Sequence, residues 1–255
     1  MWRNWYSRTT QNRLEVTPCG FESHHAHSAS LATLRRNSSK SSIPWGPVLA
    51  YIVGLITTDG CLSSDKRHIV LTSSDIDQLE TFKKGLGLKN KIGMTRNARS
   101  VSYRVQFSNV NFYDWLVSIG LSDHKSLTLG KILIPDLYFR DFLRGHLDGD
   151  GSITTYTDYY NTNKNPSYVY ERLWVRFISA SENHIQWLQK KIDTLLKVTG
   201  RIHKRGPDRP NQHPMFVLKF AKKESLLLLH QLYYADDVPA LKRKRVLYER
   251  FLTKM

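Results

Sequence analysis

The sequence of 255 residues has only two cysteines, Cys19 and Cys61, and no apolar run close to the length that spans a bilayer. Two cysteines exclude a disulfide framework and a cysteine-ligated zinc site, and such low use is typical of a reducing compartment. We therefore expect an intracellular protein without a membrane partner. A bacterial or archaeal cytoplasm is the simplest location, and a mitochondrion or chloroplast is the alternative.

Acidic residues are also scarce. The chain has 22 Asp and Glu against 38 Lys and Arg, which gives a formal net charge of +16. A surplus of this size favours a polyanionic partner and generates a field that steers it toward the protein. Nucleic acid is the partner class that we expect. The alternative is a basic protein without a specific partner, such as one associated with ribosomes.

Residues 1–43 show no sustained apolar period and are rich in Ser, Thr, Arg, Asn and His. This composition is compatible with a transit peptide or with a disordered basic arm. A third interpretation is a reading frame that begins too far upstream, because codons for Gly20 to Ser23 can spell the T-arm consensus of a tRNA gene. We treat residues 1–43 as a leader that lies outside the folded chain.

From residue 44 onward, helix and strand patterns alternate, and they do so twice in the same order. In the first half, 44–135, we expect helices at 48–58, 75–86 and 111–119, strands at 68–72, 91–94 and 101–108, and a linker at 121–135. In the second half, 136–255, we expect helices at 138–148, 182–197, 224–234 and 241–252 and strands at 152–160, 168–179, 201–204 and 215–220. A polar, Asn-rich hairpin loop is expected at 159–166. The chain is therefore one αββαββα unit written twice.

Two short segments repeat most closely. The letters IVGLITTDG at residues 52–60 align with LRGHLDGDG at residues 143–151, without a gap. Each segment has a glycine inside its expected helix, Gly54 or Gly145, and ends in an Asp-Gly pair at Asp59 or Asp150. The repeat thus places a carboxylate at the end of two equivalent helices.

Glycine inside a helix costs about 1 kcal/mol relative to Ala, so its presence in both helices calls for a reason. Small residues let two helix backbones approach closely, which would bring the helix ends and Asp59 and Asp150 together. Because helix C-termini carry partial negative charge, two carboxylates there repel each other unless a divalent cation lies between them. Carboxylate oxygens suit Mg²⁺. The alternative is two unrelated Asp-Gly turns, which their equivalent places in a doubled pattern argue against.

The two segments resemble the paired LAGLIDADG motifs of homing endonucleases. The second segment is close to the family pattern, whereas the first departs from it at Val53, Thr57 and Thr58. Both segments keep the final Asp, which is the metal ligand of the family. The resemblance implies an α+β fold with two pseudo-symmetric αββαββα halves, motif helices at their junction, and antiparallel sheets that form a DNA-binding saddle.

The resemblance also implies a Mg²⁺-dependent endodeoxyribonuclease, with about two or three divalent ions held by Asp59 and Asp150 at the junction of the motif helices. Such an enzyme makes a staggered double-strand break at a long, non-palindromic target and supports intron or mobile-element homing. Because both halves lie in one chain, we expect a monomer that binds double-stranded DNA and needs no protein partner. Gly54 and Gly145 would form the helix interface.

A basic residue near the attacking water is typical of the family. Lys125 and Lys244 follow the last helix of the first half and of the second half, and we assign them as the polarising, catalytic lysines. Lys242 lies close enough to leave the register of the second assignment open. Asp75 and Ser181 occupy matching places after a strand of each half and are candidates for ordering water.

The strand faces opposite the apolar side carry the candidate DNA-binding residues. These are Lys66, His68, Arg104 and Gln106 in the first half, and Tyr156, Arg172, Arg176, Arg201, His203, Arg205 and Lys219 in the second. Arginine commonly reads guanine and glutamine reads adenine. The alternative is the charged solvent face that one side of any antiparallel sheet presents.

The same scaffold also allows a binding protein, either an RNA maturase or a DNA-binding regulator. Loss of the motif acids would favour that alternative, and both acids are present. An intein-embedded nuclease is disfavoured, because the sequence shows no splicing block.

Overall fold

The computed structural model describes residues 43–97, 100–123, 125–206 and 213–254. The leader expected at residues 1–43 lies outside the described residues, except for Ile43. In the described ranges, no helix has both the length and the apolar character needed to cross a membrane.

The elements follow the predicted order in both halves. The first half contains α2 (Pro47–Asp59), β1 (Gly60–Leu62), β2 (His68–Ser73), α3 (Ile76–Leu86), β3 (Gly93–Asn97), β4 (Ser100–Ser108), α4 (Val110–Ser118) and α5 (Lys125–Thr128). The second half contains the 3₁₀ turn η1 (Asp136–Tyr138), α6 (Phe139–Asp148), β5 (Ser152–Asp158), β6 (Tyr170–Ser179), α7 (Glu182–Lys191), the π-helical turn η2 (Ile192–Leu196), β7 (Arg201–Arg205), β8 (Met215–Phe220), α8 (Lys222–Leu232) and α9 (Lys242–Leu252).

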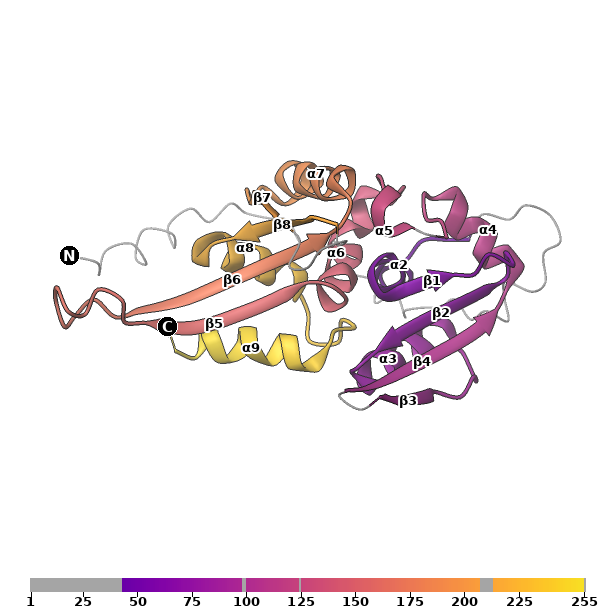
Figure 1. Ribbon diagram of the computed structural model, residues 1–255, viewed down its shortest axis with the longest axis horizontal. Coiled ribbons are helices and arrows are strands. Elements are labelled where there is room, and N and C mark those ends of the chain that lie inside the picture. Colours follow the sequence, from indigo (N-terminus) through magenta and orange to yellow (C-terminus); the bar gives the residue numbers. More distant parts are fainter. Residues whose placement is uncertain (1–42, 98–99, 124, 207–212, 255) are drawn as a thin grey trace, which may run out of the picture.

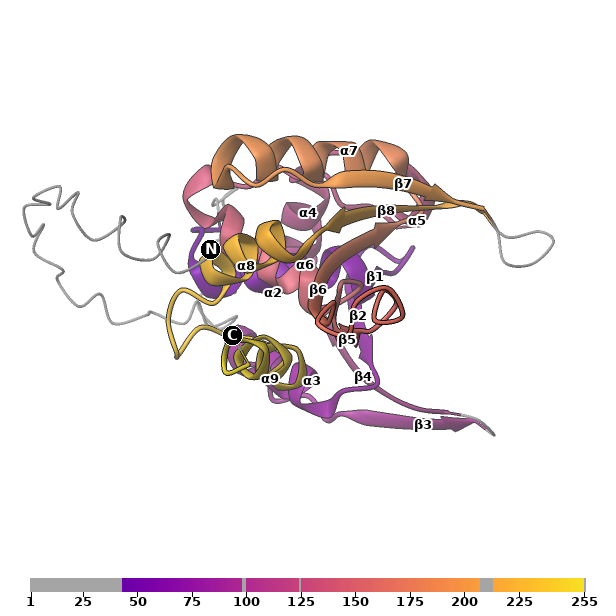
Figure 2. The same cartoon turned by 90° about the vertical axis from the view of Figure 1, so that its left-hand side faces the viewer.

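Each half has one four-stranded sheet. The strand orders are β1-β2-β4-β3 and β5-β6-β8-β7, and every neighbouring pair is antiparallel. In both sheets the first strand of the half pairs with the second, the second with the fourth and the fourth with the third, which confirms the duplicated architecture. Figure 1 shows the sheets next to each other along the long axis, with α2 and α6 between them. Figure 2 shows β3–β4 and β7–β8 projecting to the same side of the molecule, below and above β5 and β6.

Alternation along the strands decides which sheet face is covered. In β2, Ile69 and Leu71 are buried, and in β6 Leu173, Val175 and Phe177 are buried. Helices α3, α7 and α8 pack against their sheets and help to close the core on that side. The residues between the buried positions point to the opposite side, which we call the open face of each sheet.

The helices α2 and α6 join the halves, and their backbones are in direct contact at the two motif glycines. A Cβ atom on Gly54 would lie 2.2 Å from the Phe142 carbonyl oxygen, and one on Gly145 would lie 2.0 Å from the Tyr51 carbonyl oxygen. Both distances are far below an ordinary contact, so only glycine fits at either position. The prediction of a glycine-mediated helix interface is therefore confirmed.

Several details differ from the sequence-based expectation. Strand β1 was not predicted, because three residues between a helix and a turn carry too little period to detect. The predicted linker at 121–135 contains the short helix α5 and packs on the core through Leu129 and Ile132. The helix expected at 182–197 changes to a π-helical turn after Lys191 and ends at Lys197 in the left-handed conformation.

Candidate active site at the helix junction

Asp59 ends α2, and Asp150 follows the end of α6 by two residues. Because the two helices cross at their glycines, their C-terminal ends lie beside each other (Figure 1). A Cβ atom on Gly149 would lie 3.1 Å from Asp59 Oδ2 and 1.9 Å from Thr58 Oγ1. The chain segment that carries Asp150 therefore packs directly on the carboxylate of Asp59.

The electrostatics of this pair follow from crowding. Asp59 is half-buried, while Asp150 remains exposed at the surface. Burial, and then the charge of Asp150, raise the pKa of Asp59 to about 7, and protein atoms that displace water around the carboxyl group of Asp150 raise its pKa, although the residue keeps an exposed surface. The charges of Lys125 and Lys244 act on both carboxylates in the opposite direction. The structure thus brings together the four residues that the sequence singled out as catalytic.

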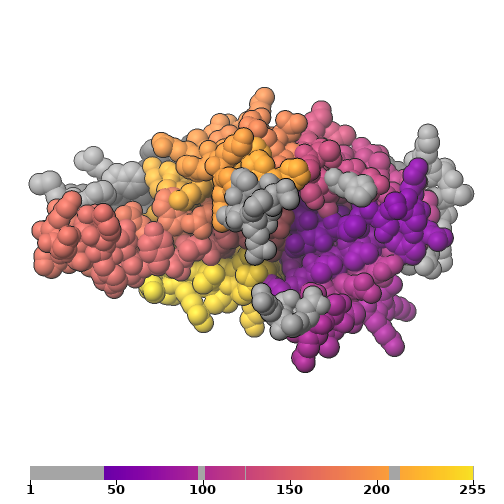
Figure 3. All heavy atoms as spheres, in the orientation of Figure 1, coloured from indigo at the N-terminus to yellow at the C-terminus, as the bar shows by residue number. Residues whose placement is uncertain are grey.

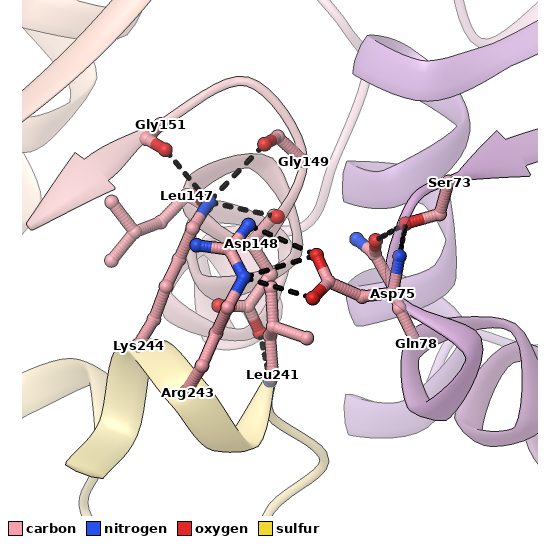
Figure 4. A network of polar contacts seen from close by, with 10 residues as sticks. All are labelled: Ser73, Asp75, Gln78, Leu147, Asp148, Gly149, Gly151, Leu241, Arg243 and Lys244. Carbon is pink, nitrogen blue, oxygen red and sulfur yellow. Dashed lines mark hydrogen bonds and ion pairs between the residues drawn. The ribbon is translucent and has the colours of Figure 1, made fainter. Parts of the chain in front are cut away.

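Lys244, in the first turn of α9, is almost fully buried. Its Nζ donates to backbone carbonyl oxygens at the end of α6, at 2.6 Å for Leu147, 2.9 Å for Asp148, 3.2 Å for Gly149 and 2.7 Å for Gly151 (Figure 4). These carbonyls have few partners of their own at a helix end, and burial lowers the pKa of Lys244 to about 8. Lys244 therefore fixes the turn that presents Asp150.

Lys125 has the equivalent place in the first half. It begins α5, is buried, and its Nζ donates to the carbonyl oxygen of Gly60, the residue after Asp59. Burial lowers the pKa of Lys125. Each lysine thus holds the backbone that follows one motif helix, and neither is a solvated surface lysine.

Asp75 and Ser181, the candidates for ordering water, have different surroundings. Both Asp75 carboxylate oxygens accept from Arg243 Nε at 3.0 Å, so an ion pair links the first half to α9 of the second (Figure 4). Ser181 is buried, accepts from the His184 amide at 3.4 Å and donates to the Leu129 carbonyl at 2.5 Å. The water-ordering prediction is wrong for Ser181, because its hydroxyl is occupied as a helix cap away from solvent.

The departure of the first motif from the family pattern has a structural counterpart. Asp148, the inner acid of the second motif, is fully buried and accepts from Tyr51 Oη at 3.0 Å and from the Leu241 amide at 2.7 Å. Thr57, its counterpart, donates to the Val53 carbonyl of its own helix at 2.7 Å. Asp148 thus links both α2 and the start of α9 to α6, whereas Thr57 bonds only within its own helix.

The register places the predicted DNA-binding residues of the first half as follows. His68 pairs with Ser108, Val70 with Gln106 and Thr72 with Arg104, so His68, Arg104 and Gln106 share the open face of the first sheet. Lys66 is an exception, because it lies in the turn before β2 with φ of 58°. The prediction that Lys66 lies on a strand face is wrong, since the strand begins only at His68.

All seven candidates of the second half lie on the open face of the second sheet. Tyr156 pairs with Arg172, Lys219 pairs with both Arg176 and Arg201, His203 pairs with Val217, and Arg205 pairs with Met215. Each of these residues alternates with residues that point toward the core, such as Leu173, Val175 and Leu218. Trp174 and Arg243 were not among the predicted site residues, although Trp174 lies between Arg172 and Arg176 in the same alternating strand.

Among the described residues, no three or more His, Cys, Asp and Glu side chains gather in a way that could hold a metal ion. A cation at the junction would therefore depend on the two carboxylates, on backbone carbonyls and on water. That donor set is all oxygen and matches the way Mg²⁺ is bound, with few protein ligands and several waters. Burial, and after it the charge of Asp150, raise the pKa of Asp59 to about 7, as expected for a half-buried carboxyl with a second acid near it.

No family model matches the sequence, and no curated protein matches it. Solved structures do match. I-SmaMI bound to its uncleaved DNA target with calcium has a TM-score of 0.53 and 13% identity, and the match covers 82% of this chain and 90% of that one. I-DmoI in complex with DNA and calcium has a TM-score of 0.50 and 17% identity, covering 80% of this chain and 97% of that one.

Full-length WhiA from Thermotoga maritima also matches, with a TM-score of 0.51 and 17% identity. The match covers 84% of this chain but only 63% of WhiA, so the chain spans less than two thirds of that protein. I-SmaMI is described as a LAGLIDADG homing endonuclease. The two sheets, their strand order and the crossed motif helices agree with these matches, and the resemblance inferred from the motifs is confirmed for the fold. The chain therefore has the fold of the LAGLIDADG homing endonucleases.

Proposed function

We propose that this protein is a site-specific DNA endonuclease that makes a metal-dependent staggered break in a long, non-palindromic duplex. The observation that carries the proposal is the junction of α2 and α6. There the charge of Asp150 acts on Asp59, and the charges of two buried lysines, Lys125 and Lys244, act on both carboxylates. Two equivalent acids on a pseudo-symmetric scaffold suit the hydrolysis of one phosphodiester in each strand. Since one chain supplies both acids, a monomer is sufficient.

Asp59 and Asp150 are the residues that would hold Mg²⁺. A divalent cation bound there supplies Lewis-acid activation of the phosphate and of water and stabilises the leaving oxygen. The chain's own contribution is positioning. Lys244 holds the backbone of residues 147–151, and Lys125 holds Gly60, so that each carboxylate is presented from a turn whose carbonyls are satisfied.

The open faces of both sheets are the surface on which the duplex would lie. They carry Arg104 and Gln106 in the first half and five cations, Arg172, Arg176, Arg201, Arg205 and Lys219, in the second. Figure 3 shows the two halves meeting in the middle of this view, so a duplex along the long axis would pass over the helix junction. Unequal side chains on the two faces are the reason to expect a target without twofold symmetry.

The test is selection of cleaved molecules from a randomised duplex library with Mg²⁺. We expect the wild-type protein to enrich one long sequence cut on both strands. Asp150→Asn should still bind the selected duplex but should cut neither strand at a comparable rate. Cleavage by Asp150→Asn at the wild-type rate would remove the junction from the mechanism.

A binding protein without nuclease activity is the second candidate. It is favoured by the match to WhiA, which shares the fold and is not described as an endonuclease. The two candidates separate in the same experiment, because a pure binder enriches duplexes by retention but yields no cut ends with Mg²⁺.

A further inference from the structure

The open face of the second sheet carries aromatic rings in its outer part. Tyr156 lies on β5, and Tyr170 and Trp174 lie on β6, where the register pairs Tyr156 with Arg172. Tyr156 is 47% exposed and Tyr170 is 43% exposed, and Trp174 is partly exposed. We call Tyr156, Tyr170 and Trp174 the aromatic strip. It lies on the β5–β6 arm that extends away from the helix junction (Figure 1).

Cations lie over one face of two of these rings. The guanidinium carbon of Arg172 is 5.2 Å from the centre of the Tyr170 ring, and Lys219 Nζ is 3.8 Å from the centre of the Trp174 ring. Trp174 and Lys219 also line a surface pocket of about 590 Å³ together with Arg201 and His203. Two acids are near, since Asp158 pairs with Arg172 and Glu224 lines the same pocket, but cations outnumber them.

The described residues of the first sheet include no counterpart to the aromatic strip. Its two central strands place His68, Val70, Thr72, Arg104, Gln106 and Ser108 on the open face. None of the described residues on that face is Phe, Tyr or Trp. The strip is therefore not something that this fold needs in order to lie on a duplex, because the equivalent sheet does without it.

Rings and cations interleaved on a sheet suit a partner whose bases are unpaired. In a duplex the base faces are covered by their neighbours, and only base edges are reachable from a groove. Single strands expose those faces, which stack on aromatic side chains while neighbouring cations contact the phosphates. Tyr170 and Trp174 are about 13 Å apart along the strand, at roughly 3.3 Å per residue. That length accommodates about two or three stacked bases.

We propose that the aromatic strip, together with Arg172 and Lys219, binds unpaired bases of a single-stranded nucleic acid. This is a binding activity separate from duplex cleavage, and it needs neither the acids of the helix junction nor a divalent cation. A single-stranded RNA and a single-stranded DNA offer the same stacking and phosphate chemistry, so the experiment includes both.

The test is fluorescence anisotropy of the full chain with labelled oligo(dT) and oligo(U) of about 12 nucleotides, a length within the usual site size of such surfaces. EDTA is present throughout, so that a failure of the proposed nuclease has no influence on the result. Trp174→Leu and Tyr170→Leu remove a ring but keep an apolar side chain, and each should weaken binding about tenfold. Trp174→Phe should restore most of the loss.

Arg104→Ala is the matched control, because it changes the open face of the half that has no aromatic strip. It should weaken binding to a hairpin duplex and leave oligo(dT) and oligo(U) binding within about twofold. Thermal melting of each variant establishes that it is folded. Tighter binding of oligo(U) or of oligo(dT) identifies RNA or DNA as the preferred source. The proposal is overturned if neither oligonucleotide binds, or if the leucine variants weaken only duplex binding.

Discussion

The glycine-mediated crossing of α2 and α6 gives the sharpest stability prediction. In Gly145→Ala, the new methyl group would stand 2.0 Å from the Tyr51 carbonyl oxygen and 3.2 Å from the Cα atom of Gly54. An ordinary contact begins at about 3.4 Å, so the helices must separate by more than about 1 Å. The obstacle is backbone on a helix that is held by its own hydrogen bonds, so it cannot rotate aside.

The magnitude is the difference between two effects. Overpacking of this kind costs about 3 kcal/mol or more, while Ala in place of Gly in a helix returns about 1 kcal/mol. We therefore expect Gly145→Ala to lower the free energy of unfolding by about 2 kcal/mol, measured by urea denaturation. Cleavage should fall further, because the same separation moves Asp150 away from Asp59.

Gly85→Ala is the control, since Gly85 is also inside a helix. Its new methyl group would meet the side chains of Ile52 and Val48, at 2.7 Å and 2.9 Å, and these can shift. Gly85→Ala should therefore change stability by less than about 1 kcal/mol. Equal effects of the two substitutions, or a Gly145→Ala protein as stable as wild type, would refute the close crossing of α2 and α6.

Three further predictions concern the surroundings of the junction. Lys244→Met should lower the free energy of unfolding in urea by about 3 kcal/mol, because it leaves buried carbonyls without a donor, while the exposed Lys242→Met should change it hardly at all. Equal costs would show that the hydrogen bonds of Lys244 do not hold the turn after α6. Asp75→Arg and Arg243→Asp should each slow cleavage by about two- to fivefold, a small effect because the ion pair is exposed. The double variant, which restores the pair with its charges exchanged, should recover the rate. A double variant that stays slow would mean that the ion pair has no influence on cleavage. Burial lowers the pKa of His184 to about 4. As the pH falls, the unfolded chain therefore binds a proton on this imidazole before the folded chain does. The stability that neutral His184 contributes above about pH 6.5 is lost as the pH falls toward 4. His184→Gln should reduce that acid loss by up to about 1.4 kcal/mol per pH unit, and an unchanged pH profile would show that His184 is not buried in its neutral form.

The sequence predicted what depends on local period and on repetition. The order of helices and strands, the two open faces and the pairing of Gly54 with Gly145 follow from alternation and from one motif written twice. The four residues Asp59, Asp150, Lys125 and Lys244 come together as expected. This grouping could be predicted because the residues occupy equivalent positions in the two halves, and equivalent positions close to a pseudo-twofold axis lie near each other.

Features that depend on tertiary packing were not predictable. Nothing in the local sequence says that the Lys244 ammonium turns inward to four carbonyls, or that Arg243 beside it reaches Asp75 of the other half. Ser181 was assigned to water because it occupies the place in the second half that matches Asp75 in the first, but its hydroxyl caps the buried start of α7. Lys66 was assigned to a strand because the alternation continues past the true strand start into the turn.

The proposed nuclease requires Asp59 and Asp150 to bind divalent cations together at the junction of α2 and α6. The most direct measurement replaces Mg²⁺ by Fe²⁺ and lets ascorbate and peroxide generate radicals that cut the polypeptide beside the bound iron. We predict two cuts, one near residue 59 and one near residue 150, both suppressed by excess Mg²⁺ and both lost in Asp59→Asn and in Asp150→Asn. A cut in only one of the two segments, or cuts that persist in either variant, would contradict the shared site.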